Sequence, residues 1–424
     1  MSFSTCFRGY ELFVEKKTGS SRQVTGFHYI CKTTQHATPS YRGQILISAF
    51  ILCLASCRAH STSGDFSNKG ILSSKGVKTR LMNTEIKLEE LSGPLAWSDD
   101  DKYISVINSF NTTLITYRLS DMAPVGRFEY SNGSSPGQSI FYLGSDQILL
   151  GYNRQSPTGM NRTVVSCSTE SGKIVKQFAT ADVQTVLQPL FAYSDIKKYV
   201  AVPTLTISKI PAVEGGYRSA EIRLLDALTG KLMQVFEWSD VKHRGVPTAM
   251  GFSPNGNKMA VGTSSGKLLV FDLLKNGTRN EFILYDSSSS IGALSFSPDG
   301  KSIATGRSNL ALEVSNMPLS VEIWDAETGR RLNGLPGIVS NGDDAHKKAA
   351  PVKSISWSHS TNELAIADGQ SIRVWQMSKK LPKLKLSREV LYDSTHTGAS
   401  DLEFSRNGAL AVSVNDKIVI LRKD

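Results

Sequence analysis

The chain has 424 residues, of which 40% are apolar, 8% aromatic and 20% charged, so it is long and apolar enough for a large core. Its net charge is +10, but residues 1–57 contribute +4 (6 basic, 2 acidic), which leaves +6 for the 42 basic and 36 acidic side chains of the remainder. This weak excess, without a dense basic run interleaved with aromatic residues, argues against a nucleic-acid partner.

The five cysteines are concentrated near the N-terminus. Cys6, Cys31, Cys53 and Cys57 precede residue 58, and only Cys167 lies beyond it. The larger part of the chain therefore cannot hold an internal disulfide, and no Cys or His pair has the spacing of a zinc site. We expect no metal and no cofactor, and a fold that is held together by packing alone.

An apolar run covers residues 45–55 and follows Arg42. A membrane-spanning helix needs about 20 apolar residues, so this shorter run fits the apolar region of a secretory signal peptide. The next residues, Leu54-Ala55-Ser56-Cys57, resemble the lipobox of bacterial lipoproteins. The resemblance implies that Cys57 becomes the mature N-terminus and carries a lipid. It also implies a place in the bacterial cell envelope, in the outer membrane of a Gram-negative cell because Arg58 replaces the aspartate of the inner-membrane retention signal.

The position of this run is unusual for a signal peptide, because residues 1–44 precede it. No Met occurs between Met1 and Met82, so a shorter leader would need a non-Met start codon, for example at Val24. After Cys57, residues 58–78 are rich in Ser, Gly, Lys and Asn and predict a flexible tether.

One pattern returns along the rest of the chain: an aromatic residue, then Ser, then a turn rich in Pro, Asp, Asn and Gly, then an alternating strand. The clearest copies are Phe252-Ser253-Pro254-Asn255-Gly256 and Phe296-Ser297-Pro298-Asp299-Gly300. The aromatic markers are Trp97, Tyr142, Tyr193, Phe252, Phe296, Trp357 and Phe404. A unit of four strands takes about 40–45 residues, so the markers predict seven such units, some with insertions.

The unit near residue 291 shows all four strands, a to d. Strands a, b and c are predicted at 291–296, 302–306 and 320–325, and Thr328-Gly329-Arg330 turns into strand d. Strand c ends in Trp324-Asp325, the dipeptide of the WD-repeat family, which the chain resembles over about residues 80–424. The resemblance implies an all-β fold, a seven-bladed, WD40-like β-propeller. The Gly-His pair that opens a family repeat is absent, and the family's b–c turn aspartate is represented only by Asp368 and Asp416.

The two ends of the repeat region complement each other. The last unit supplies strands a, b and c at 400–404, 409–414 and 417–422, and then the chain ends without a strand d. Residues 79–91 alternate in polarity and precede the first unit. We expect them to provide the missing outer strand and to protect the ring from opening.

No catalytic constellation is present in the repeat region, so we do not expect an enzyme. Its histidines form no metal-spaced pair, and the GxSxG, Walker and GxGxxG motifs are absent. Asp99-Asp100-Asp101 occupies a turn between strands a and b, where a solvated turn is a simpler interpretation than a calcium site.

Five long segments are the candidate binding elements. By the predicted strand order, 153–162, 203–220 and 307–319 are b–c loops and 239–247 and 335–350 are d–a links, so all five lie on one face. Long loops on a rigid scaffold commonly carry binding. The candidate binding residues on them are Arg154, Arg162, Tyr217, Arg218, His243, Arg244, Arg307, His346, Lys347 and Lys348. Their charge predicts an acidic partner, either a protein, a glycan or the envelope surface.

Three functions follow from this interpretation. The first is a lipid-anchored, extracytoplasmic propeller that acts as a monomeric protein-interaction scaffold. The second is a propeller enzyme, of the hydrolase or lactonase type, with a site in the central channel. The third is a cytoplasmic WD40 scaffold whose residues 1–57 are a spurious leader.

Overall fold

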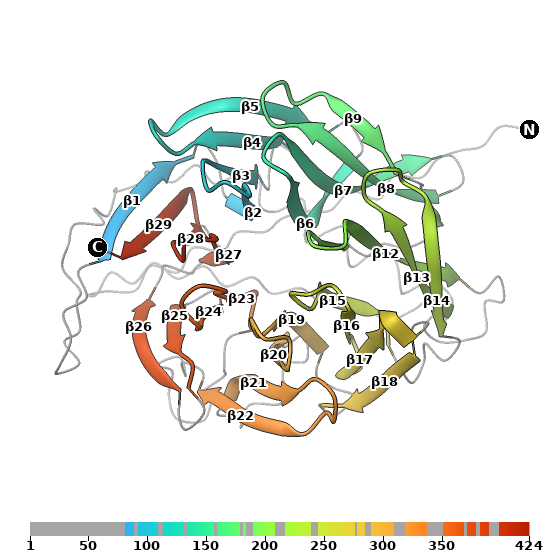
Figure 1. Cartoon of the computed structure of the whole chain (residues 1–424). Helices are drawn as coiled ribbons and strands as arrows, with labels where there is room; N and C mark the ends of the chain where they lie inside the picture. Colours follow the sequence, from blue (N-terminus) through green and yellow to red (C-terminus); the bar gives the residue numbers. More distant parts are fainter. Residues whose placement is uncertain are drawn as a thin grey trace, which may run out of the picture. The chain divides into compact units, whose positions relative to one another are not determined.

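Figure 1 shows a computed structural model of the chain. The structure describes residues 81–423 except for gaps at 89–91, 109–112, 131–133, 157–158, 179–180, 184–189, 208–216, 239–244, 276–277, 285–289, 309–318, 337–350, 369–370, 379–381 and 390–397. The apolar run, Cys57 and the predicted tether lie outside the described residues. In the described part, no helix has the length and apolar character needed to span a bilayer.

The fold is all-β. Seven small antiparallel sheets stand in a ring as a seven-bladed β-propeller, as the sequence predicts (Figure 1). We number the blades I to VII in chain order and letter their strands a to d from the axis outward.

Blades I to III follow each other along the chain. Blade I contains β2 (Ser92–Trp97), β3 (Tyr103–Asn108), β4 (Thr113–Arg118) and β5 (Ala123–Glu129). Blade II contains β6 (Ser134–Leu143), β7 (Gln147–Ser156), β8 (Gly159–Ser168), β9 (Ile174–Gln177) and β10 (Ala181–Val183). Both β9 and β10 pair with β8, so its strand d is one strand in two pieces. Blade III contains β11 (Ala192–Ser194), β12 (Tyr199–Ile207), β13 (Tyr217–Asp226) and β14 (Leu232–Trp238).

Blades IV to VI have the same order. Blade IV contains β15 (Pro247–Phe252), β16 (Lys258–Thr263), β17 (Lys267–Asp272) and β18 (Thr278–Ile283), with the short 3-10 turn η1 (Leu273–Lys275) after β17. Blade V contains β19 (Ser290–Phe296), β20 (Ser302–Ser308), β21 (Leu319–Asp325) and β22 (Arg331–Pro336). Blade VI contains β23 (Ser354–Trp357), β24 (Glu363–Ala367), β25 (Ser371–Gln376) and β26 (Lys383–Glu389).

Blade VII is built from both ends of the repeat region. Its inner strands are β27 (Ala399–Phe404), β28 (Leu410–Val414) and β29 (Lys417–Lys423), and its outer strand is β1 (Leu81–Lys87). Strand β1 pairs antiparallel with β29 along its whole length, from Leu81 opposite Lys423 to Lys87 opposite Lys417. The prediction that the segment before the first unit closes the ring is therefore confirmed for Leu81–Lys87, while residues 79–80 and 89–91 lie outside the described residues.

The middle strands of each blade explain why this sequence makes a propeller. Strands such as β24 and β28 are buried at every position, because both of their faces pack against neighbouring blades. A strand buried on both faces favours a continuous apolar run, which is what their sequences, Glu-Leu-Ala-Ile-Ala and Leu-Ala-Val-Ser-Val, approach. The outer strands face solvent on one side and carry more polar residues.

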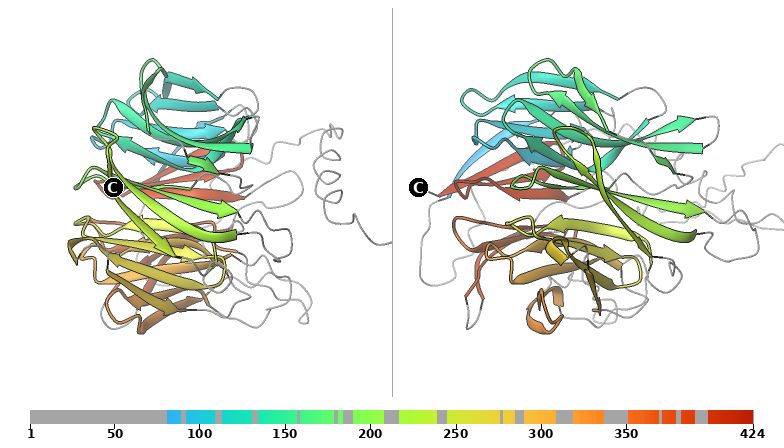
Figure 2. Two further views of the ribbon diagram at one scale, coloured as in Figure 1. Left: turned by 90° about the vertical axis from the view of Figure 1, so that its right-hand side faces the viewer. Right: turned by 45° about the vertical axis from the view of Figure 1, so that its right-hand side comes forward.

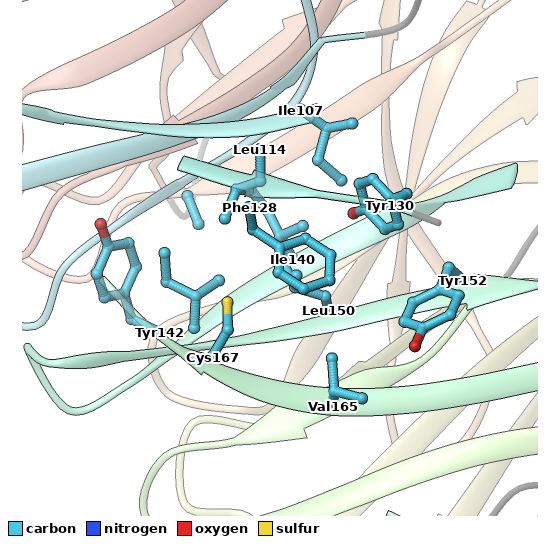
Figure 3. Close-up of a cluster of buried hydrophobic side chains, with 12 residues drawn as sticks. Ile107, Leu114, Phe128, Tyr130, Ile140, Tyr142, Leu150, Tyr152, Val165 and Cys167 are labelled. Carbon is cyan, nitrogen blue, oxygen red and sulfur yellow. The ribbon is translucent and has the colours of Figure 1, made fainter. Parts of the chain in front are cut away.

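The hydrophobic core is divided into seven clusters, one between each pair of neighbouring blades. Figure 3 shows the cluster between blades I and II, where Leu114 and Phe128 meet Ile140, Leu150 and Cys167. The cluster between blades VII and I contains residues from β1 as well as from β29 and β3. The ring therefore closes through packing as well as through strand pairing.

Candidate functional site

The connections between strands divide the propeller into two different faces. Because neighbouring strands are antiparallel, the a–b and c–d turns lie on one face, and the b–c and d–a connections lie on the other (Figure 2). The a–b turns are all short and run 98–102, 144–146, 195–198, 253–257, 297–301, 358–362 and 405–409. The longest b–c and d–a connections run 184–191, 208–216, 239–246, 309–318, 337–353 and 390–398. We call these the short-turn face and the long-loop face.

The structure corrects one of the five predicted long loops. Residues 153–162 are mostly strand, because β7 and β8 continue as a ladder from Gln147–Ser168 to Ser156–Gly159. The polar side chains of this stretch predicted a loop. A two-stranded ladder satisfies its backbone hydrogen bonds internally, so it forms without apolar residues. Arg154 and Arg162 are thus strand residues, as are Tyr217 and Arg218 at the start of β13. The strand order otherwise places the long connections on one face, as predicted.

Arg307 is the one residue of the predicted binding set whose side chain the structure describes. It lies in β20, is half-buried, and its Nη2 is 3.3 Å from Glu322 Oε2. Glu322 also accepts an ion pair from Arg331 at 3.1 Å. Arg307 is therefore held by its own blade, at the end of β20 next to the 309–318 connection. His243, Arg244, His346, Lys347 and Lys348 lie outside the described residues.

The serine of the repeat pattern holds the a–b turns. Ser297 Oγ donates to Asp299 Oδ1 (2.6 Å) and accepts from the backbone N–H of Ser302 (2.9 Å). Ser253 makes the same two contacts with Asn255 and Lys258. The turns also touch each other, since a Cβ on Gly256, which has a φ of 67°, would stand 2.4 Å from Lys197 of blade III. The short-turn face is therefore a rigid ring of similar turns.

An ionic cluster joins three blades on the short-turn face, and the sequence analysis did not find it. Arg406 of blade VII places Nη2 3.0 Å from Asp99 of blade I and 2.9 Å from Asp195 of blade III. The carboxylate of Asp101 accepts the backbone N–H groups of Arg406 and Asn407 at 3.1 and 3.0 Å. Burial, followed by the charge of Asp195, raises the pKa of Asp99, and Arg406 opposes this rise.

These contacts revise the solvated-turn interpretation of Asp99-Asp100-Asp101. Asp99 binds the guanidinium of Arg406, and Asp101 binds the backbone amides of Arg406 and Asn407. The acidic turn therefore links blade I to blade VII. In the described part of the chain, no group of three His, Cys, Asp or Glu side chains is arranged to hold a metal ion.

A second network joins the inner strands of blades VII and I. Asp401 and Glu403 of β27 accept the backbone N–H groups of Leu95 and Trp97 of β2, both at 2.9 Å. The indole N–H of Trp97 donates to the backbone oxygen of Glu403 at 3.0 Å. An inner strand is the edge of its sheet and presents unpaired backbone groups, so side chains of the next blade supply the partners. The only sequence signal for this role is two acids spaced by two residues in a predicted strand a.

Both carboxyl groups have perturbed acidities. Burial raises the pKa of Asp401 to about 6, against the hydrogen bonds that it accepts. Burial also raises the pKa of Glu403 to about 8, where the hydrogen bond from Trp97 opposes the rise and the charge of Asp401 adds to it. Near neutral pH, Glu403 is therefore largely protonated, and the pair carries less negative charge than two ordinary carboxylates.

This arrangement predicts a pH-dependent stability. Between about pH 4.5 and pH 8 the folded chain keeps the Glu403 proton that the unfolded chain releases, so the free energy of unfolding falls as pH rises through this window. Glu403→Gln keeps an acceptor for Trp97 but removes the titration, and should flatten the profile. Urea denaturation at several pH values measures this, with the exposed Glu129→Gln as control. An unchanged slope in Glu403→Gln would contradict the assignment.

Comparison with solved structures places this geometry among known folds. The chain is similar to a WD40 propeller protein in the crystal structure of the mitotic checkpoint complex, with a TM-score of 0.59, 13% identity, and coverage of 87% of this chain and 99% of that one. It is also similar to U3-55K, with a TM-score of 0.60, 12% identity, and coverage of 80% and 98%. The fold is a WD40-like propeller. No family model and no curated protein matches the sequence.

Blade VI has a buried aspartate at the start of its b–c turn. Asp368 accepts the backbone N–H and hydroxyl of Ser371 at 2.7 and 2.9 Å, and its Oδ2 is 2.7 Å from Arg373 Nη2. In blade VII the corresponding buried acceptor is Asn415, whose Oδ1 accepts the N–H of Gly398 at 2.8 Å. The sequence pointed to Asp416 instead. Asn415 is the equivalent residue because it directly follows β28, as Asp368 directly follows β24.

Proposed function

We propose that this protein is a lipid-anchored, extracytoplasmic propeller scaffold of the bacterial cell envelope that recruits a protein partner through its long-loop face. The observation that carries the proposal is the difference between the two faces. The a–b turns are all short, and serine hydrogen bonds fix those of blades I, IV, V, VI and VII, whereas the longest connections all open on the opposite face. A rigid ring that holds long connections side by side suits recognition of a protein surface.

The two solved structures to which the chain is similar support a scaffold role only in general terms. One of these proteins is part of the mitotic checkpoint complex, and both are WD40 propellers. At 12–13% identity, their partners are not transferable to this chain. Apart from Arg307, which pairs with Glu322, the predicted basic residues of the long-loop face support an acidic protein as the partner.

The lipid anchor is tested by metabolic labelling. Cells that express the full chain should incorporate a fatty-acid analogue into it, and Cys57→Ala should remove the label and release the protein from membranes. Cys53→Ala, a cysteine in the same apolar run, is the matched control and should keep the label. Equal labelling of both variants, or an unlabelled wild type that retains residues 1–57, would favour the cytoplasmic alternative.

The binding face is tested by charge reversal. Changing Arg218, Arg244 and Lys347 together to Glu should reduce partner capture by at least about tenfold, because each reversal replaces an attraction with a repulsion. The matched control reverses Lys301, Arg330 and Arg422, which are exposed on turns and strand ends of the short-turn face. Equal capture by both triple variants in a cross-linked pull-down would refute this assignment of the face.

A further inference from the structure

The short-turn face carries exposed apolar side chains at the tips of its turns. Leu228 in the c–d turn of blade III is 60% exposed, and Leu274 in that of blade IV is 70% exposed. Ile196, in the a–b turn of blade III, is 66% exposed. At the adjoining end of blade II, Ile174 and Val175 are 50% and 56% exposed. Apolar turn tips therefore project from the adjacent blades III and IV, next to two exposed apolar residues at the start of strand d in blade II. Leu332 and Leu384 hold similar positions in blades V and VI and are less exposed, at 43% and 41%.

The turns hold these leucines outward without needing them for the fold. Asp226 Oδ1 accepts the N–H of Leu228 at 3.0 Å and that of Thr229 at 2.6 Å, and Asp272 Oδ1 accepts the N–H of Leu274 at 3.0 Å. In blade V the same turn presents Glu327, whose N–H donates to Asp325 Oδ1 at 3.1 Å. Because one turn type accepts either Leu or Glu at the tip, the fold does not require leucine at these positions.

Lysines border the apolar tips. The Nζ of Lys176 donates to the backbone oxygen of Leu228, which joins the end of blade II to the turn of blade III. Lys173 and Lys231 are exposed beside Ile174 and Leu232, and among the described residues no carboxylate pairs with either lysine. A row of shallow apolar tips with lysines beside them suits the interface of a bilayer, where the tips insert and the ammonium groups meet lipid phosphates.

The chain enters the propeller on this same face. Leu81, the first residue of β1, lies opposite Lys423 at the end of β29. Because β29 is strand c of blade VII, this end lies on the short-turn face. The segment that would join a lipid on Cys57 to β1 is only residues 58–80. Blades III and IV lie across the ring from blade VII, so a tether at one edge and apolar tips at the other give two points of attachment.

We infer that the short-turn face is a membrane-contact surface. The exposed apolar side chains of blades II to IV insert into a bilayer that contains anionic lipid. This inference deepens the proposed function and rests on its lipid anchor for the second point of attachment. A tether alone would let the domain rotate freely. Contact through the tips would hold the long-loop face toward the aqueous compartment, where the partner is.

The test measures binding to vesicles of phosphatidylethanolamine and phosphatidylglycerol by sedimentation. All variants carry Cys57→Ala in the full chain, so that no lipid modification contributes. The double variant Leu228→Glu, Leu274→Glu should lower the vesicle partition coefficient by about tenfold or more, because two apolar side chains that insert into the bilayer are replaced by charged ones. Glu327→Leu, which adds a tip on blade V, should raise it. The matched control is Ile283→Glu, a 73% exposed side chain at the opposite end of β18, which should change nothing.

Equal partitioning of the double variant and the wild type, or an equal loss in Ile283→Glu, would overturn the inference. Loss of partner capture in the double variant with unchanged vesicle binding would also overturn it, and would assign the tips to a protein. Thermal unfolding of each variant confirms that the ring is intact. Failure of the anchor itself is seen separately, as missing fatty-acid label on wild-type Cys57, and leaves the vesicle comparison valid.

Discussion

Ile86→Asp should lower the free energy of unfolding by at least about 3 kcal/mol, because it removes a buried apolar side chain and places a charge in its position. Ile86 is 4% exposed and belongs to the cluster that closes the ring between blades VII and I. Denaturation by urea measures the change. Hydrogen exchange of the β29 amides should rise as well, since their outer partner is β1.

The neighbouring residue supplies a close control for this variant. Lys87→Asp introduces the same side chain, with the same low β-propensity, into the same strand, but Lys87 is exposed. We expect it to leave the β29 amides protected. If Ile86→Asp and Lys87→Asp had equal effects, the cluster would contribute nothing specific and ring closure would depend on backbone pairing alone.

Asp368→Asn should cost about 3–5 kcal/mol, because it leaves a buried guanidinium without its counter-charge. Arg373 and Asp368 are 2% and 1% exposed, and their closest atoms are 2.7 Å apart. Burial lowers the pKa of Arg373, and the charge of Asp368 opposes this change. The carboxylate therefore stabilises the charged form of the buried guanidinium. The measurement is the urea midpoint of unfolding near pH 7.

An exposed ion pair provides the comparison for Asp368→Asn. Asp121 contacts Arg118 at 2.9 Å, and both side chains are about half exposed. Solvent screens such a pair, so Asp121→Asn should leave the midpoint unchanged. Similar midpoints for the two variants would mean that burial of the Asp368–Arg373 pair does not matter to the stability of blade VI.

The sequence predicts the local units of this fold well. Each blade repeats an aromatic residue, a serine and a tight turn within a few positions, and the serine hydrogen bonds in the a–b turns explain why that spacing recurs. The closing strand is also predictable, since residues 79–91 alternate in polarity and the last unit lacks a strand d. These features depend on neighbours in sequence or on counting strands.

Contacts between blades could not be predicted from the sequence. Arg406 meets Asp99 and Asp195 only because the ring brings the turns of blades VII, I and III together, and nothing near Arg406 in the sequence indicates those partners. Asp401 and Glu403 bind backbone amides 306 residues away. The prediction of a loop at 153–162 was wrong for another reason. Strands β7 and β8 pair there as a ladder, which forms without an apolar pattern. The candidate residues of the long-loop face remain predictions.

Closure of blade VII by both ends of the repeat region has a consequence for biosynthesis. Strand β1 is made first, yet its partner β29 comes last, and the Glu85–Lys417 contact between them spans 332 positions. A ribosome-bound chain therefore holds β1 without its partner until β29 has emerged. During that interval β1 and the incomplete sheet of blade VII have unpaired edges, which are sites of aggregation. The nascent chain therefore needs protection until β29 pairs with β1.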